Sequence, residues 1–255
     1  MRLVLMLILP IVTACGRSAV PTHSVPATSD AVHYAECFDG VAFIPTSLDA
    51  LNASLPSGFV ARDGSLLGNQ FKGSGLLAVL YLSCPKVDGS WGHRVFVATP
   101  IEAPSLASDL RAVEWHWYEY ERFVDTEEQA VALRTQGFSA RVATMSNAPF
   151  MRDGSEASFV IEVAGDTAAV IHGLVESATE SPAQSHRAWH VSADGRLLTT
   201  RWDFRPHHSR WGSIDSCTLR PDLLVRDVAG AQCARNAMME AIAAIEFDEQ
   251  VTQWK

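Results

Sequence analysis

Lysine is scarce in this sequence, and basic residues are outnumbered by acidic ones. Only three of the 255 residues are lysines, Lys72, Lys86 and Lys255, and 20 basic residues face 29 acidic ones, a net charge of −9. Proteins that bind nucleic acid need basic side chains to neutralise phosphates, so this composition argues against a nucleic-acid partner. A basic cluster that would bind an anionic membrane surface is missing as well.

The sequence also lacks the short motifs of the common enzyme and metal-site classes. It contains no GxSxG, HExxH, Walker A, GxGxxG or CxxC sequence, which argues against serine hydrolases, nucleotide-dependent enzymes and zinc sites. His186 and His190 are four residues apart in an expected strand, which separates them by about 13 Å, too far for one metal ion. We therefore expect neither a metal ion nor a cofactor.

No apolar run is long enough to span a membrane, but the N-terminus carries a different membrane signal. The run Leu3–Val12 has about half the roughly 18–20 residues of a spanning helix, and Val12-Thr13-Ala14-Cys15-Gly16 matches the bacterial lipobox. We expect residues 1–14 to be a lipoprotein signal peptide and acyl chains on Cys15 to anchor the protein. The alternative is an ordinary secretory signal with a chance cysteine. Gly16 rather than Asp after the cysteine predicts the outer membrane of the cell envelope, facing the periplasm.

Four cysteines remain after Cys15, an even number that favours two disulfides in an exported protein. They are Cys37, Cys84, Cys217 and Cys233, and three pairings are open. We favour Cys37–Cys84 with Cys217–Cys233, because local pairs close easily. The alternative is buried free thiols.

The mature chain has two parts. Residues 15–32 are rich in Ser, Thr, Pro and Ala, without apolar periodicity, and are expected to form a flexible tether behind the lipid. Residues 33–255 are expected to form a single β-rich globular domain.

Most of this domain is predicted to consist of short strands separated by turns. Hairpins are expected from 75–83 with 93–99, 155–163 with 167–175, and 187–192 with 196–204, with a last strand over 245–253. A helix is expected to begin at Asp125, which has capping-box spacing to Glu128, and to end at Gly137. Shorter helices are expected over 221–228 and 233–245. This pattern predicts an α+β fold, mainly antiparallel β, with a curled sheet or barrel and one or two peripheral helices.

A row of ionisable side chains follows one face of the segment 113–123. Simple alternation puts Glu114, His116 and Arg122 on one face and Trp115 and Trp117 on the other. If the first face lined a barrel interior, His116 could act as a base and Arg122 could bind a carboxylate, with Glu114 beside them. The alternative is a solvated outer face with the tryptophans in the core. These three residues are the catalytic candidates.

Three stretches together resemble the acetoacetate-decarboxylase-like β-barrel superfamily. They are LPSGF (55–59) leading to GLLAVLYLSC (75–84), FVDTEEQAVALRTQGF (123–138) and WGSIDSCTLRPDLLVRDVAG (211–230), within about residues 50–245. The resemblance implies a closed or nearly closed barrel whose interior can hold a small organic ligand. Such decarboxylases use a Schiff-base lysine activated by a neighbouring cation. No lysine here has another beside it, so no catalytic residue is carried over.

Three functional hypotheses follow. The leading one is a non-catalytic, lipid-anchored envelope protein that binds a small ligand or has a structural role. One alternative is an envelope enzyme with a polar barrel interior that is not a Schiff-base decarboxylase. The other is a scaffold for another envelope protein, bound through an exposed aromatic patch such as Trp91 or Trp211.

Overall fold

The computed structural model describes residues 27–86, 91–105, 115–148, 156–176, 178–224 and 237–254. The predicted signal peptide, Cys15, Glu114 and Cys233 lie outside the described residues. Among the helices that are described, none is long and apolar enough to cross a membrane.

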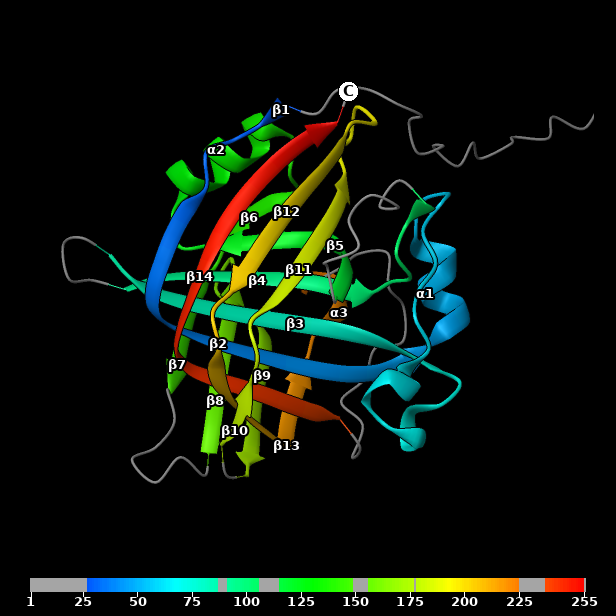
Figure 1. Ribbon diagram of the computed structural model, residues 1–255, viewed down its shortest axis with the longest axis vertical. Coiled ribbons are helices and arrows are strands. Elements are labelled where there is room, and N and C mark those ends of the chain that lie inside the picture. The colour runs from blue at the N-terminus through cyan, green and yellow to red at the C-terminus, as the bar shows by residue number, and fades with distance from the viewer. Residues whose placement is uncertain are drawn as a thin grey trace, which may run out of the picture.

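Seven strands close into a barrel (Figure 1). Around the ring they are β12 (Leu197–Phe204), β11 (Gln184–Val191), β5 (Trp115–Val124), β4 (Trp91–Pro100), β3 (Ser74–Pro85), β2 (Val32–Ser47) and β14 (Met238–Trp254), which pairs again with β12. Most pairings are antiparallel; β5 pairs in parallel with β11 and with β6 (Ala140–Val142). The structure thus confirms the predicted α+β class with a curled, mainly antiparallel sheet.

The long strand β14 joins the barrel to a second layer. Its first residues pair with β13 (His207–Leu219) and its last ones with β12. From β13 the sheet continues through β9 (Asp166–Val175), β8 (Glu156–Val163) and β7 (Thr144–Ala148). This extension packs on the outer surface of the barrel, where Tyr81 of β3 stacks on Phe159 of β8 at 5.3 Å between ring centroids. The short strands β1 (Ala27–Thr28) and β10 (Thr179–Ser181) pair with β14 and β13.

The helices lie at the periphery, as expected from the few helix signals in the sequence (Figure 1). They are α1 (Leu48–Ser54), α2 (Glu127–Gln136) and α3 (Pro221–Leu224), with 3₁₀ turns η1 (Gly64–Leu67) and η2 (Asn69–Phe71). Helix α2 ends at Gly137 with φ 106°, as predicted. Its N-cap is Thr126 rather than Asp125, because Asp125 instead accepts a hydrogen bond from the backbone N–H of His93.

Two apolar cores follow from the alternation of side chains along the strands. One fills the barrel interior, with side chains such as Leu80, Phe96 and Phe247. The other lies between the outer barrel wall and the second layer, with Phe38, Tyr81 and Phe159. Since strands between the two cores are apolar on both faces, β3 reads as a continuous apolar run rather than an alternating one.

The three predicted hairpins are confirmed as β3–β4, β8–β9 and β11–β12. The predicted helix over 233–245 is wrong for the part that the structure describes, because strand β14 begins at Met238. Ala-rich and Met-rich composition favours a helix locally, but β14 is held between β2 and β13 along this stretch. Strand pairing also begins earlier than expected, since Ala27 and Thr28 pair with the end of β14.

The predicted disulfide between Cys37 and Cys84 is present. Neighbouring residues Phe38 and Ser83 face each other across β2 and β3, and this register places the two cysteines side by side. Cys217 is disulfide-bonded as well, while its favoured partner Cys233 lies outside the described residues.

Candidate functional site

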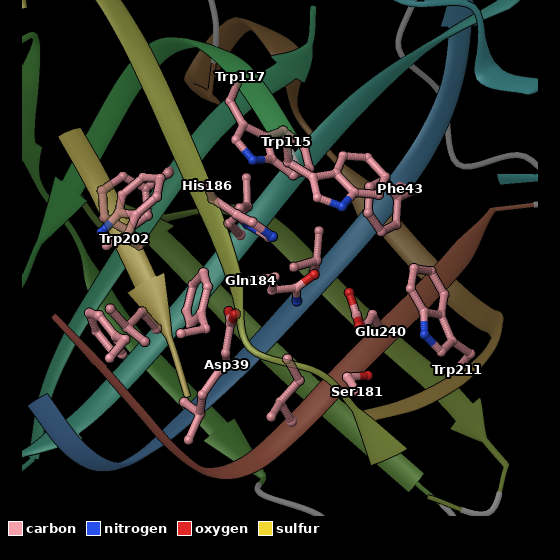
Figure 2. Close-up of a pocket in the computed structure, with 18 residues that line it drawn as sticks. Asp39, Phe43, Trp115, Trp117, Ser181, Gln184, His186, Trp202, Trp211 and Glu240 are labelled. Atoms are coloured by element: carbon pink, nitrogen blue, oxygen red, sulfur yellow. The ribbon is translucent and has the colours of Figure 1, made fainter. Parts of the chain in front are cut away.

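The barrel interior is not completely filled. A cavity of about 150 Å³ lies among apolar side chains of β2, β3, β4 and β14 and polar ones from β10 and β11. A cavity of this size holds a molecule about as large as benzene. The labelled residues in Figure 2 that line it are Asp39, Phe43, Trp115, Trp117, Ser181, Gln184, His186, Trp202, Trp211 and Glu240.

Two carboxyl groups reach this cavity from adjacent strands. Asp39 of β2 pairs with Ile242 of β14, and Glu240 pairs with Val41, so the two acids are diagonal neighbours on one face. Figure 2 shows both carboxyl groups pointing into the same space as the ring of His186. No lysine or arginine is among the described residues that line the cavity.

The pKa values of both carboxyl groups are strongly raised. Burial raises the pKa of Asp39 to about 7 against a weaker opposing hydrogen bond from the backbone of Gly40. Burial and then the charge of Asp39 raise the pKa of Glu240 to about 8, while a hydrogen bond from Ser209 opposes this. An apolar cavity without a cation favours the neutral carboxyl.

His186 is the third ionisable group that lines the cavity. Burial and then the nearby His207 lower its pKa to about 3, so its imidazole is neutral at physiological pH. Its ring packs edge-on against Phe204 at 4.8 Å and lies close to Trp115 and Trp117.

Three nitrogen atoms of these side chains have no hydrogen-bond partner. They are the buried indole Nε1 atoms of Trp117 and Trp202 and Nε2 of His186. The side chains of Trp117 and Trp202 are only 2% and 5% exposed. These nitrogen atoms have almost no surface that a water-sized molecule could reach, so the side chains line the cavity with their apolar ring surfaces.

The structure separates the catalytic candidates proposed from the sequence. Glu119 pairs with Ala98 and Glu121 with Val97, so Tyr120 is the extra residue of a β-bulge in β5. A bulge reverses the alternation of side chains beyond it. The prediction that His116 and Arg122 share a face is therefore wrong.

His116 lies outside the barrel interior. Trp189 donates its indole N–H to Nδ1 of His116 at 3.0 Å, and the two rings stack. Burial, and then the charges of Arg187 and Arg62, lower the pKa of His116 to about 4. His116 is thus a neutral, hydrogen-bonded core residue, and Glu114 lies outside the described residues.

Arg122 lies inside the barrel in a closed ion pair. It makes two hydrogen bonds to the carboxylate of Glu119, at 2.9 and 2.8 Å, and one to the hydroxyl of Thr200. Both charged side chains are 1% exposed. Arg94 similarly binds Glu249 at 2.7 Å; burial would raise the pKa of Glu249, but Arg94 and Arg122 lower it. These arginines border a separate hollow of about 590 Å³ beside α2.

No lysine among the described residues is placed for Schiff-base chemistry. Lys72 follows η2 and Lys86 follows β3, and both are exposed; Lys255 lies outside the described residues. Of the two tryptophans suggested for an exposed aromatic patch, Trp211 instead stacks on Phe43 at 5.8 Å and lines the cavity. The side chain of Trp91 is not among those that the structure describes.

The architecture matches solved structures at low sequence identity. The enduracididine biosynthesis enzyme MppR complexed with pyruvate aligns with a TM-score of 0.59 at 15% identity, covering 94% of each chain. The fold is acetoacetate-decarboxylase-like. Acetoacetate decarboxylase from Legionella pneumophila aligns with a TM-score of 0.54 at 12% identity over 92% of this chain and 89% of that one. An acetoacetate decarboxylase-like enzyme from Sphingomonas wittichii aligns at 0.50 and 12%, over 89% and 92%.

At 12–15% identity these likenesses show a shared fold and nothing beyond it. The sequence matches no protein-family model and no curated protein.

Sequence reasoning missed the two cavity carboxyl groups. Asp39 alternates with Cys37, Val41 and Phe43, and Glu240 precedes the apolar Ile242 on its face of β14. A lone acid at a core-facing position of an apolar strand was the available signal, since unpaired acids are rarely buried. For Glu240 the expected helix over 233–245 concealed this pattern.

Proposed function

We propose that this protein is a lipid-anchored component of the bacterial cell envelope whose barrel binds a small organic ligand without transforming it. The observation that carries the proposal is the cavity itself, which combines a mostly apolar wall with two carboxyl groups and has no lysine among its described lining residues. Concave, mostly apolar sites with a few polar groups are typical of small-ligand binding. The pyruvate complex of MppR supports small-molecule binding by a protein with this fold.

The lipobox supports the envelope location, with Cys15 as the lipidated residue. We expect radioactive palmitate to label the wild-type chain in a bacterial host and to leave a Cys15→Ser variant unlabelled. Equal labelling of both proteins, or of neither, would reject the lipid anchor.

Native mass spectrometry of the full chain, extracted from membranes with detergent, tests ligand binding. We expect a discrete added mass that disappears on denaturation. A Ser181→Phe substitution would fill the cavity edge and remove this mass, whereas Glu180→Phe, at the exposed neighbouring position, would keep it. A bare chain after exposure to a library of small organic compounds would reject the proposal and favour a structural role.

An enzyme remains the second candidate because of one observation. The pKa values of about 7 for Asp39 and about 8 for Glu240 suit proton transfer near neutral pH. Recovery of the bound molecule unchanged after prolonged incubation supports a binding protein. Turnover that is lost in Glu240→Gln would support the enzyme instead.

A scaffold receives less support from the described surface. The large apolar side chains exposed there are Val32, Val60, Val131 and Leu174, which lie on separate segments. Isolated apolar residues of this kind do not form the contiguous patch that a docking surface needs.

A further inference from the structure

The described wall of the cavity has acidic side chains but no lysine or arginine, whereas other acids inside the barrel are paired with arginines. The buried acids Glu119 and Glu249 each bind an arginine, at 2.8 and 2.7 Å. Asp39 and Glu240 lie side by side without any basic side chain on the described cavity wall. Burying an ionised acid without a cation is unfavourable, so these two acids either keep their protons or ionise beside a cation that comes from outside the protein.

Aromatic rings form the wall nearest to Glu240. Trp115 stacks on Trp117 at 5.4 Å, and Phe43 stacks on both Trp117 and Trp211, at 6.2 and 5.8 Å. Figure 2 shows Trp115, Phe43 and Trp211 along the side of the cavity to which the Glu240 carboxyl group belongs. Aromatic faces next to carboxylates are the surroundings that attract ammonium ions through cation–π and charge interactions.

We propose that the cavity binds a small organic ammonium ion, with the charge near Asp39 and Glu240. This inference rests on the proposed ligand-binding function and names the chemical class of the ligand. The cavity volume of about 150 Å³ limits the ligand to roughly the size of benzene.

Binding of a cation is expected to release protons. The polar groups around the two carboxyls are the neutral His186 and Gln184 from β11, with His207 of β13 near His186, and the hydroxyls of Ser181 and Ser209. None of these is a lysine or an arginine, so the ligand must compete with protons on the acids. Affinity for a permanent cation therefore rises with pH as the acids ionise.

Calorimetry with three probes tests this inference on the full chain in detergent. The probes are choline, its uncharged isostere 3,3-dimethyl-1-butanol, and propionate as an anion. We expect choline to bind at least ten-fold more tightly than the isostere, and at least ten-fold more tightly at pH 8.5 than at pH 6. We also expect a Glu240→Gln substitution to weaken choline binding ten-fold while leaving binding of the isostere unchanged. Glu176→Gln, at an exposed position, is the matched control and should change neither.

The outcomes separate this inference from the function on which it rests. If the isostere or propionate binds and choline does not, the cavity binds ligands but the cation assignment is wrong. The same holds if choline binds equally well at both pH values and in Glu240→Gln. If none of the probes binds and the native mass is bare, both proposals fail.

Discussion

The two cavity carboxyls, Asp39 and Glu240, lead to a prediction about stability that can be tested without a ligand. We expect a variant that carries both Asp39→Asn and Glu240→Gln to lose a large part of the pH dependence of unfolding above neutrality. In the folded protein these carboxyls hold their protons up to pKa values of about 7 and about 8. In the unfolded chain they ionise near pH 4. Unfolding therefore releases protons, and stability falls as pH rises towards the folded pKa values.

The size of the effect follows from these pKa values. Each pH unit between the unfolded and folded pKa of one group costs about 1.4 kcal/mol. From pH 6.5 to 8.5, the pH lies below the folded pKa of Asp39 for about half a pH unit and below that of Glu240 for about one and a half. The wild type therefore loses about 3 kcal/mol of unfolding free energy relative to the double variant. Comparing the two proteins removes the contribution of the histidines, which both contain.

Urea unfolding at pH 6.5 and 8.5, followed by tryptophan fluorescence, measures this difference. Glu128→Gln, at an exposed position in the first turn of α2, is the control and should follow the wild type at both pH values. If the free-energy difference between wild type and double variant is the same at both pH values, the two carboxyls are not held neutral by burial.

Three further predictions concern the frame of the barrel. An Arg122→Met substitution leaves the buried Glu119 carboxylate unpaired and should cost about 3–5 kcal/mol in urea unfolding, most of it recovered by adding Glu119→Leu; full additivity of the two changes would contradict this. Replacing Cys37 and Cys84 by serine opens a loop of 47 residues and should cost about 4 kcal/mol under oxidising conditions, with no loss when both proteins are reduced. A Gly212→Ala substitution would make Cβ clash with the backbone carbonyl oxygen of Leu174 in β9; we expect loss of soluble protein, and a normally folded variant would show that β13 and β9 are not paired this closely.

The sequence predicted the fold best where the local signals were strong. The β3–β4, β8–β9 and β11–β12 hairpins each joined apolar or alternating runs through a recognisable turn, and all three formed. The end of α2 at Gly137 was equally clear, because glycine readily adopts the positive φ of a helix C-cap.

The long strands were predicted less well because their partners are distant in sequence. β14 pairs with β2 across about 200 residues and with β12 and β13 nearby, and only this pairing turns an Ala-rich and Met-rich segment into a strand. Local propensity is weak compared with such tertiary contacts.

The extra residue Tyr120 is the reason that His116 and Arg122 do not share a face. Strict alternation over residues 113–123 placed His116 with Arg122, but the bulge at Tyr120 moved Arg122 to the barrel interior beside Glu119. No residue in the sequence marks this bulge, because the extra residue is defined only by the pairing of β5 with β4.

The sequence by itself predicted a mainly antiparallel fold, favoured the Cys37–Cys84 pair among three open pairings, and showed that no lysine has another lysine beside it. Tertiary structure alone decided which polar side chains meet inside the barrel. Asp39 and Glu240 are 201 positions apart in the printed sequence, and they become neighbours only through the register of β2 against β14. Their raised pKa values arise in the same way, because burial and the absence of a nearby cation are properties of the closed barrel and not of either strand.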